Sequence, residues 1–354
     1  MNRSEIIHLG WDDEWEATLA ASAATGLPGR ISRVERGECD VLTEDGEQRA
    51  LSDSQRSQSR LAPVTGDWVT LERSSDSDVG DDVLPLIEMV LERRTLLVRK
   101  DPGEREEHQP LAANVDVVLL VHGFDRPLRP GKLERFLVLA WNAGATPIVV
   151  LTKADLVGAS HVADLVGVVE AVAPGVQVIV SSSLEGDEAF SGVEQVRVLL
   201  SGGQTATLLG ESGAGKSTMV NALLGREVQE TKEVRHGDAK GRHTTITRDL
   251  IVLPTGGFLI DTPGIRAVGL WDARDALEQV FSDITELASS CRFGDCAHNT
   301  EPGCAVRDAV EDGEVDPRRL DRYVAMGEEL QQSEQRLVER DRATSPGRRR
   351  RRSG

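Results

Sequence analysis

The chain has 354 residues, a formal net charge of −18 at pH 7 and four cysteines. Its length predicts two or three domains with enough residues to bury a core, and its acidic balance is unusual for a protein that binds nucleic acid. No apolar run is long enough to cross a bilayer, and the residues after Met1 lack the apolar core of a signal peptide. We therefore expect no contact with a membrane and a cytoplasmic protein.

The first part of the chain predicts a small β-barrel behind a short extension. Residues 1–28 contain Trp11 and Trp15 and are assigned to an extension that is helical or irregular. Between residues 29 and 99, short alternating segments are separated by acidic or glycine-containing turns, which is typical of a barrel of the oligonucleotide-binding (OB) type. Cys39 is interpreted as a small apolar residue.

A linker is expected at residues 100–110, before a region in which apolar strands alternate with polar loops and helices. The first of these strands is expected at 115–121. The pattern predicts an α/β domain at residues 100–275.

A short polar motif ends the next apolar strand, expected at 146–151, and contains Thr152, Lys153, Ala154 and Asp155. An aspartate carboxylate can accept hydrogen bonds from the N1–H and the exocyclic amine of guanine, whereas adenine offers no matching pair of donors. The motif indicates guanine recognition by Asp155, with Lys153 lying along the base. Alone it is weak, because Asp155 also suits the N-cap of a helix.

The following strand, expected at 176–180, leads into a serine turn that contains Ser181 and Ser182. Backbone N–H groups of this turn could contact the guanine O6 atom. An ordinary strand end explains these serines equally well.

A glycine-rich loop lies between a strand expected at 205–209 and a helical segment at 219–224. Its glycines let backbone N–H groups and the helix N-terminus point at phosphate oxygens. The lysine would reach the β- and γ-phosphates, and the serine hydroxyl after it would bind Mg²⁺. The predicted nucleotide-binding residues are Gly210, Glu211, Ser212, Gly213, Ala214, Gly215, Lys216, Ser217 and Thr218.

A polar, glycine-rich segment at 237–247 precedes a strand expected at 250–253 and is interpreted as switch I. Such a segment adds one hydroxyl ligand to Mg²⁺ when GTP is bound. We expect Thr244 or Thr245 to provide it, and Thr247 stays open. His243 is the candidate that positions the attacking water, although a loop histidine without a role is an equally good interpretation.

The strand expected at 257–260 ends at Asp261, which begins the sequence Asp-Thr-Pro-Gly. An acidic residue at the carboxyl end of a strand lies where nucleotides bind in open α/β sheets. We expect Asp261 near Mg²⁺ and the Gly264 N–H near the γ-phosphate, as in a switch II motif. Ile265 stands where Ras-like enzymes carry a glutamine that orients water, so hydrolysis is expected to be slow.

Three of the cysteines lie close to one histidine, at Cys291, Cys296, His298 and Cys304. In a reducing compartment this grouping favours a metal over a disulfide. Three thiolates and one imidazole form a closed tetrahedral set, which is typical of structural zinc, and the polar loop argues against buried reduced cysteines. We expect one zinc per chain in a helical domain at 276–338, followed by a disordered arginine-rich tail at 339–354.

The guanine motif precedes the phosphate loop, which is the reverse of the order in an ordinary GTPase. With a barrel before these motifs and a Cys₃His loop after them, residues 29–335 closely resemble the circularly permuted GTPases of the ribosome small-subunit-dependent GTPase A (RsgA) family. The resemblance implies three domains, 30S ribosomal subunits and 16S rRNA as partners late in assembly, and release after GTP is hydrolysed to GDP.

The resemblance also carries the roles of individual residues. It matches residues 152–155 to the guanine motif, although Thr152 stands where most GTPases have Asn, and it matches Lys216, Ser217 and Asp261 to the catalytic machinery, with His243 as the further candidate. Because switch II leads into the zinc-bearing region in this permuted order, the nucleotide state could bias the position of that region. The basic residues expected to meet rRNA phosphates are Arg93, Arg94, Arg99, Arg235, Lys240 and Arg242. The arginine run at 348–352 could add to this contact, although a solvated disordered end is the commoner meaning of such a run.

Two other functions remain compatible with the phosphate loop. An ATP-dependent kinase or ATPase would use the same loop, but Asp155 argues against it. The second alternative is a nucleotide-dependent RNA-binding scaffold without ribosomal activation. The presence of Lys216, Ser217 and Asp261 argues against a scaffold that has lost nucleotide hydrolysis. We expect the active GTPase to be a monomer.

Overall fold

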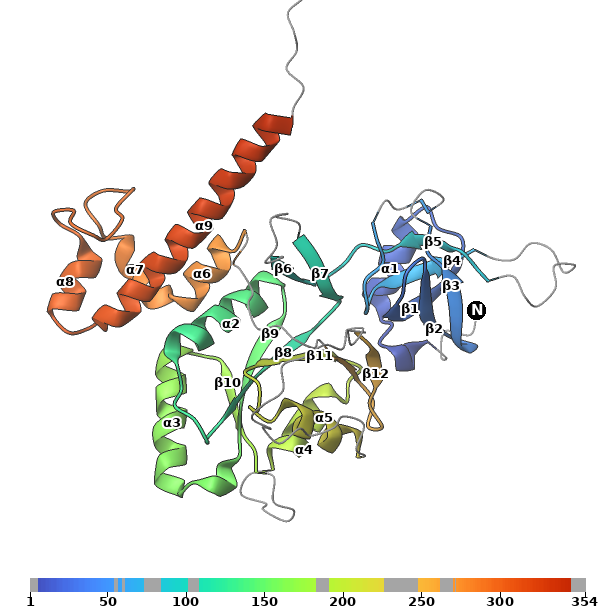
Figure 1. Cartoon of the computed structure of the whole chain (residues 1–354), viewed down its shortest axis with the longest axis horizontal. Helices are drawn as coiled ribbons and strands as arrows, with labels where there is room; N and C mark the ends of the chain where they lie inside the picture. Colours follow the sequence, from blue (N-terminus) through green and yellow to red (C-terminus); the bar gives the residue numbers. More distant parts are fainter. Residues whose placement is uncertain are drawn as a thin grey trace, which may run out of the picture.

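The chain folds into three parts that follow one another in the sequence (Figure 1). The computed structural model describes residues 6–53, 57–58, 61–72, 84–100, 108–182, 191–225, 248–261, 270 and 272–344. Within these residues a β-sheet domain comes first, an α/β domain lies in the middle and a set of helices follows. The predicted fold class is confirmed.

The first domain is a sheet of five antiparallel strands, β1 (Leu27–Val34), β2 (Glu38–Thr43), β3 (Gly46–Leu51), β4 (Trp68–Leu71) and β5 (Ile87–Val90), in the order β3-β2-β1-β4-β5. A parallel bridge between Leu51 and Leu86 brings the two edge strands together and closes the sheet as in an OB-type barrel. Cys39 is fully buried in the barrel core. Burial raises the pKa of its thiol to about 12, so it behaves as the apolar residue predicted.

The N-terminal extension packs against the barrel through its tryptophans. It contains η2 (Ile7–Leu9) and α1 (Asp13–Ala21). Asp12 caps α1 by accepting a hydrogen bond from the Trp15 backbone N–H at 2.8 Å. The Trp11 ring meets the edge of Trp68 of the barrel, with ring centroids 4.7 Å apart. The extension is therefore part of the folded N-terminal region.

Two of the arginines expected to meet rRNA form ion pairs within this region. Arg93 donates two hydrogen bonds to Asp67, whose side chain is fully buried. Arg94 pairs with Asp12 and stacks over the Trp15 ring at 4.1 Å. Their charges are matched within the chain, and rRNA contacts at these two arginines stay a prediction.

A two-stranded antiparallel ribbon, β6 (Leu96–Lys100) and β7 (His108–Ala113), connects the barrel to the α/β domain. The sequence predicted only a linker at 100–110, so both ends of that segment are corrected to strand. The Asp-Pro-Gly sequence at 101–103 suggested a linker, but the same residues are also common between paired strands.

The central sheet has six strands, β8 (Val117–Gly123), β9 (Thr146–Thr152), β10 (Gln177–Val180), β11 (Thr205–Gly210), β12 (Leu250–Val252) and β13 (Phe258–Ile260), in the order β10-β9-β8-β11-β13-β12. Only the pairing of β12 with β13 is antiparallel. Because the other strands run in one direction, the loops that follow them meet at one edge of the sheet.

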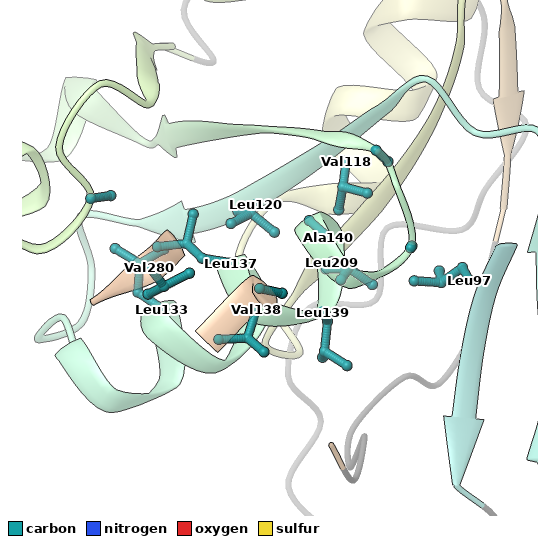
Figure 2. Close-up of a cluster of buried hydrophobic side chains, with 14 of the residues drawn as sticks. Leu97, Val118, Leu120, Leu133, Leu137, Val138, Leu139, Ala140, Leu209 and Val280 are labelled. Atoms are coloured by element: carbon teal, nitrogen blue, oxygen red, sulfur yellow. The ribbon is translucent and has the colours of Figure 1, made fainter. Parts of the chain in front are cut away.

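Helices cover both faces of this sheet, namely α2 (Pro130–Asn142), α3 (Ala159–Val172), α4 (Gly192–Leu200) and α5 (Lys216–Leu224). Val118 and Leu120 of β8 belong to the core cluster that includes α2 and α3, and Figure 2 shows Leu137 of α2 in this cluster. Val117 and Leu119 belong to the cluster of α4 and α5 on the other face. The strands are therefore apolar on both sides, as expected for a buried parallel sheet.

The C-terminal region consists of α6 (Arg274–Val280), α7 (Ser282–Ala288), α8 (Ala305–Glu311) and α9 (Pro317–Thr344). The far end of α9 projects away from the rest of the molecule (Figure 1). Residues 339–344, which the sequence assigned to a disordered tail, are the last residues of α9. Residues 345–354 lie outside the described residues.

The C-terminal helices dock on α2 through a buried carboxylate. Glu134 is fully buried and accepts hydrogen bonds from Arg319 at 3.0 Å and from Arg322 at 2.5 and 2.9 Å. Val280 of α6 lies beside Leu133 in the adjoining apolar contact (Figure 2). Since removing one partner of a buried ion pair leaves an unpaired charge, this contact ties the region firmly to the α/β domain.

Candidate GTP-binding and zinc sites

The phosphate loop turns sharply between β11 and α5. At Gly210 a Cβ atom would lie 2.3 Å from the Val121 carbonyl oxygen of β8. Gly215 has a φ of +97°, and a Cβ there would lie 2.9 Å from Thr152 Oγ1. Only glycine fits both places, because one lacks space and the other also requires the left-handed region. The helix α5 begins directly after Gly215, so its N-terminus faces the loop.

The loop lysine lies across the loop that precedes it. Lys216 Nζ donates hydrogen bonds to the carbonyl oxygens of Gly210 and Glu211, each at 2.8 Å. These contacts hold the ammonium group at the loop, where a phosphate chain would need a cation. Ser217 and Thr218 follow in the first turn of α5.

The guanine motif is bonded directly to the phosphate loop. Thr152 Oγ1 donates a hydrogen bond to the Ala214 carbonyl at 2.6 Å, and Lys153 Nζ donates one to the Gly213 carbonyl at 2.7 Å. Lys153 has a φ of +64°, a strained conformation for a residue with a side chain. The threonine that replaces the usual Asn thus still joins the two motifs, although they lie in reversed order along the chain.

The serine turn supports the guanine motif from the neighbouring strand. Ser182 Oγ donates a hydrogen bond to Asp155 Oδ1 at 3.2 Å, and the Ala154 N–H donates one to the Ser181 carbonyl at 3.2 Å. The sequence suggested a role for the backbone of this turn but gave no indication of the side-chain contact. Ser182 helps to orient the carboxylate that is predicted to recognise guanine.

Asp261 lies at the end of β13, at the same edge of the sheet. Its N–H donates a hydrogen bond to the Asp249 carbonyl at 3.2 Å, and the preceding Ile260 carbonyl accepts one from Thr207 Oγ1 at 2.9 Å. The predicted residues His243, Thr244, Thr245, Thr247, Gly264 and Ile265 lie outside the described residues.

A charged cluster that the sequence did not predict contacts the phosphate loop. Arg126 Nη1 donates a hydrogen bond to the Ser212 carbonyl at 2.8 Å. Asp125 accepts hydrogen bonds from both Arg126 and Lys153, and Lys132 Nζ lies 2.6 Å from a Glu211 carboxylate oxygen. No local motif predicts these contacts, because they join the β8–α2 connection to residues far away in the chain.

The Cys₃His residues converge between α7 and α8. The ligand atoms of Cys291, Cys296, His298 and Cys304 all lie within 4.8 Å of one another. His298 Nδ1 lies 3.7 Å from Cys291 Sγ and 3.4 Å from Cys304 Sγ, and these two sulfurs are 3.9 Å apart. Tetrahedral zinc with bonds of about 2.0–2.3 Å would separate its ligand atoms by roughly 3.5–3.8 Å. Donor set and spacing therefore fit zinc.

The loop around this cluster is held by hydrogen bonds between its own residues. The Glu301 carboxylate accepts hydrogen bonds from the N–H groups of Ala297, Asn299 and Thr300. His298 has a φ of +59°, and the Arg292 N–H donates to the Gly303 carbonyl across the loop. Such a constrained backbone is consistent with a closed structural site.

Comparison with known proteins identifies the family. The family model of the RsgA GTPase matches residues 90–271. The chain belongs to the RsgA GTPase family. RsgA proteins named small ribosomal subunit biogenesis GTPase are similar over most of their length. The one from Streptomyces coelicolor is 47% identical over 95% of this chain and 88% of its own. The one from Leptospira interrogans is 38% identical over 92% of this chain and 89% of its own.

Solved structures show the same relationship. YjeQ from Thermotoga maritima has a TM-score of 0.61 and 28% identity and covers 86% of this chain and 98% of its own. YloQ, described as a circularly permuted GTPase, has a TM-score of 0.59 and 26% identity, and it covers 89% of this chain and 98% of its own. The predicted RsgA family and GTP hydrolase activity are thereby confirmed. Among the described residues, no helix is both long and apolar enough to span a membrane.

Proposed function

We propose that this GTPase acts in the biogenesis of the 30S ribosomal subunit, binds that subunit and its 16S rRNA, and hydrolyses GTP to GDP and phosphate faster when bound to it. Relatives that match nearly the whole chain carry the name small ribosomal subunit biogenesis GTPase, which supports this role. We also propose that the protein is a cytoplasmic monomer with domains at 29–99, 100–275 and 276–338, preceded by the extension at 1–28 and followed by the end of α9 and the residues after it.

The nucleotide site proposed here rests on the bonds from Thr152 and Lys153 to the phosphate loop. They join the two motifs, so that a base bound by Asp155 and phosphates bound by residues 210–218 belong to one nucleotide. Asp155 provides specificity for guanine through its paired acceptor oxygens. The turn at Ser181 and Ser182 supports it.

The catalytic residues proposed for hydrolysis surround the phosphates. Lys216 binds the β- and γ-phosphates. Ser217, with Asp261 nearby, would hold a Mg²⁺ ion, which would supply positive charge beside the transferred phosphoryl group. Thr244 or Thr245 completes the Mg²⁺ ligands when GTP is bound, and the Gly264 N–H contacts the γ-phosphate. His243 is the proposed group that positions water.

The metal proposed for the C-terminal cluster is one structural zinc per chain. Its ligands would be Cys291, Cys296, His298 and Cys304, whose ligand atoms lie within 4.8 Å of one another. With four protein ligands the ion has no open position for water, so it stabilises the fold and takes no part in hydrolysis.

Co-sedimentation with ribosomal subunits tests the proposed partner. With a non-hydrolysable GTP analogue, the protein is expected to pellet with 30S subunits and not with 50S subunits, and GDP should reduce the bound fraction. Because rRNA phosphates contribute to binding, the bound fraction should fall steeply as salt rises. Equal pelleting with both subunits, or none with 30S in any nucleotide state, would contradict the proposal.

A further inference from the structure

Three side chains from other parts of the chain donate hydrogen bonds to backbone carbonyls of the phosphate loop. Arg126 donates to the Ser212 carbonyl at 2.8 Å, Lys153 to the Gly213 carbonyl at 2.7 Å and Thr152 to the Ala214 carbonyl at 2.6 Å. Three successive carbonyls of the loop therefore have a donor. Two of these donors belong to the guanine motif, and Arg126 belongs to none of the predicted motifs.

Peptide geometry gives these outer contacts an effect on the inner side of the loop. In a planar trans peptide the C=O and the N–H point in opposite directions. The Ser212 carbonyl shares its peptide unit with the Gly213 N–H. When Arg126 holds this carbonyl, the Gly213 N–H points to the opposite side of the peptide, where the phosphates of the proposed nucleotide site would lie.

Arg126 is fixed in place by Asp125. The guanidinium lies 3.1 Å from Asp125 Oδ2, and the same oxygen accepts a hydrogen bond from Lys153 Nζ at 2.8 Å. Hydrogen bonds from Arg126, and then from Lys153, lower the pKa of Asp125 to about 2, so this carboxylate stays ionised between the two cations. One of the guanidinium nitrogens also lies 3.1 Å from the place that a Cβ at Gly213 would occupy.

A cation at the outer end of a peptide dipole polarises it and makes the inner N–H a stronger donor. During hydrolysis, negative charge moves from the γ-phosphoryl group onto the leaving β-phosphate of GDP. Donors already aimed at this charge stabilise the transition state more than the bound substrate. The contact from Arg126 therefore favours hydrolysis more than GTP binding.

We infer that Arg126 is a positioning residue for GTP hydrolysis, which acts through the Ser212–Gly213 peptide on the β-phosphate. This inference rests on the nucleotide site proposed above. In the ordinary hydrolysis the oxygen of water forms a bond to the γ-phosphorus, and the bond from the γ-phosphorus to the bridging oxygen of the β-phosphate breaks. The bridging oxygen leaves with GDP and the electron pair of that bond, and the proton of water leaves with the inorganic phosphate or passes to solvent. Arg126 supplies only electrostatic support to this step.

The test compares Arg126→Met, which removes the charge and the donors, with Arg126→Lys, which keeps a cationic donor. Arg318→Met is the matched control, because Arg318 is exposed in the C-terminal region. Without ribosomal subunits, Arg126→Met is expected to lower kcat about tenfold, less than the loss of a direct donor to the transition state. KM should stay within twofold, Arg126→Lys should restore most of kcat, and the control should match the wild type.

Phosphorus NMR of bound Mg²⁺·GDP provides a readout that a purely structural role would not move. In Arg126→Met the β-phosphate resonance is expected to shift toward its position in free Mg²⁺·GDP, while the α-phosphate resonance moves less. An unchanged kcat and β-phosphate resonance would overturn the inference, and so would a higher KM at unchanged kcat. If circular dichroism shows that Arg126→Met is unfolded, kcat and the β-phosphate resonance are compared between Arg126→Lys, which keeps the positive charge, and Arg126→Gln, which removes it.

Failure of the underlying nucleotide site has a different signature. If wild-type protein neither binds fluorescent GDP nor hydrolyses GTP, the proposed site is wrong and the inference falls with it. If the wild type binds GDP and hydrolyses GTP, and the Arg126 variants match it in kcat and in the β-phosphate resonance, the nucleotide site stands and the inference about Arg126 is wrong.

Discussion

Asp155→Asn is expected to weaken GTP binding by at least about 100-fold and to create binding of xanthosine triphosphate. The carboxylate accepts two hydrogen bonds from guanine, each worth about 1.5–3 kcal/mol because the acceptor is charged. An Asn amide offers one acceptor and one donor, and its donor would face the guanine amine. Xanthine carries a 2-oxo group in that position, which can accept from the new amide. Fluorescence titration with GTP and xanthosine triphosphate measures both affinities.

Asp164→Asn is the matched control for this exchange, because Asp164 is exposed on α3 and far along the helix from the motif. It should leave both affinities at wild-type values. Ser182→Ala removes the hydroxyl that donates to Asp155 and is expected to weaken GTP binding only several-fold. An Asp155→Asn variant with wild-type affinity for GTP would show that this carboxylate does not recognise the base.

Cys296→Ser is expected to abolish zinc binding and to unfold the segment between α7 and α8. The cluster has four ligands, and structural zinc contributes about 10–16 kcal/mol of apparent binding free energy in small domains. Loss of one thiolate therefore removes the main stabilising interaction of a short, polar loop. Metal analysis of freshly prepared, untagged protein should give one zinc per wild-type chain and none for the variant. Hydrogen exchange should become fast at residues 289–312.

Cys39→Ser controls for the loss of a thiol, since Cys39 is buried in the barrel and lies outside the cluster. It should keep one zinc per chain. GTP hydrolysis without ribosomal subunits should persist in Cys296→Ser, because the proposed catalytic residues lie at the edge of the central sheet. Wild-type protein without zinc would refute the structural assignment of this cluster.

The parts of the fold that could be predicted from the sequence are those with local chemical signals. The glycines of the phosphate loop reflect local crowding and backbone conformation, and the spacing of Cys291 and Cys304 reflects metal geometry. The strand β9 could be predicted because an uninterrupted apolar run marks a buried parallel sheet, and β11 because a short run of β-forming and apolar residues precedes the phosphate loop.

The parts that could not be predicted depend on contacts between distant segments. The N-terminal extension has its place because Trp11 meets Trp68. The ion pair of Arg93 with Asp67 likewise forms only in the folded barrel. The contacts of Arg126 and Lys132 with the phosphate loop were not predicted for the same reason, since Arg126 lies in the β8–α2 connection and Lys132 in α2, neither of which carries a motif. Pairing between distant residues leaves no periodic pattern in a single sequence.

Steady-state GTP hydrolysis, measured at fixed GTP and titrated with 30S or 50S subunits, tests the central claim most directly. Ile265 replaces the water-orienting glutamine, so the protein alone should turn over slowly. Addition of 30S subunits should raise the rate by roughly tenfold or more, as when a partner completes a GTPase site, and 50S subunits should leave it unchanged. Equal rates with 30S subunits, 50S subunits and buffer would contradict a GTPase that acts on the small ribosomal subunit.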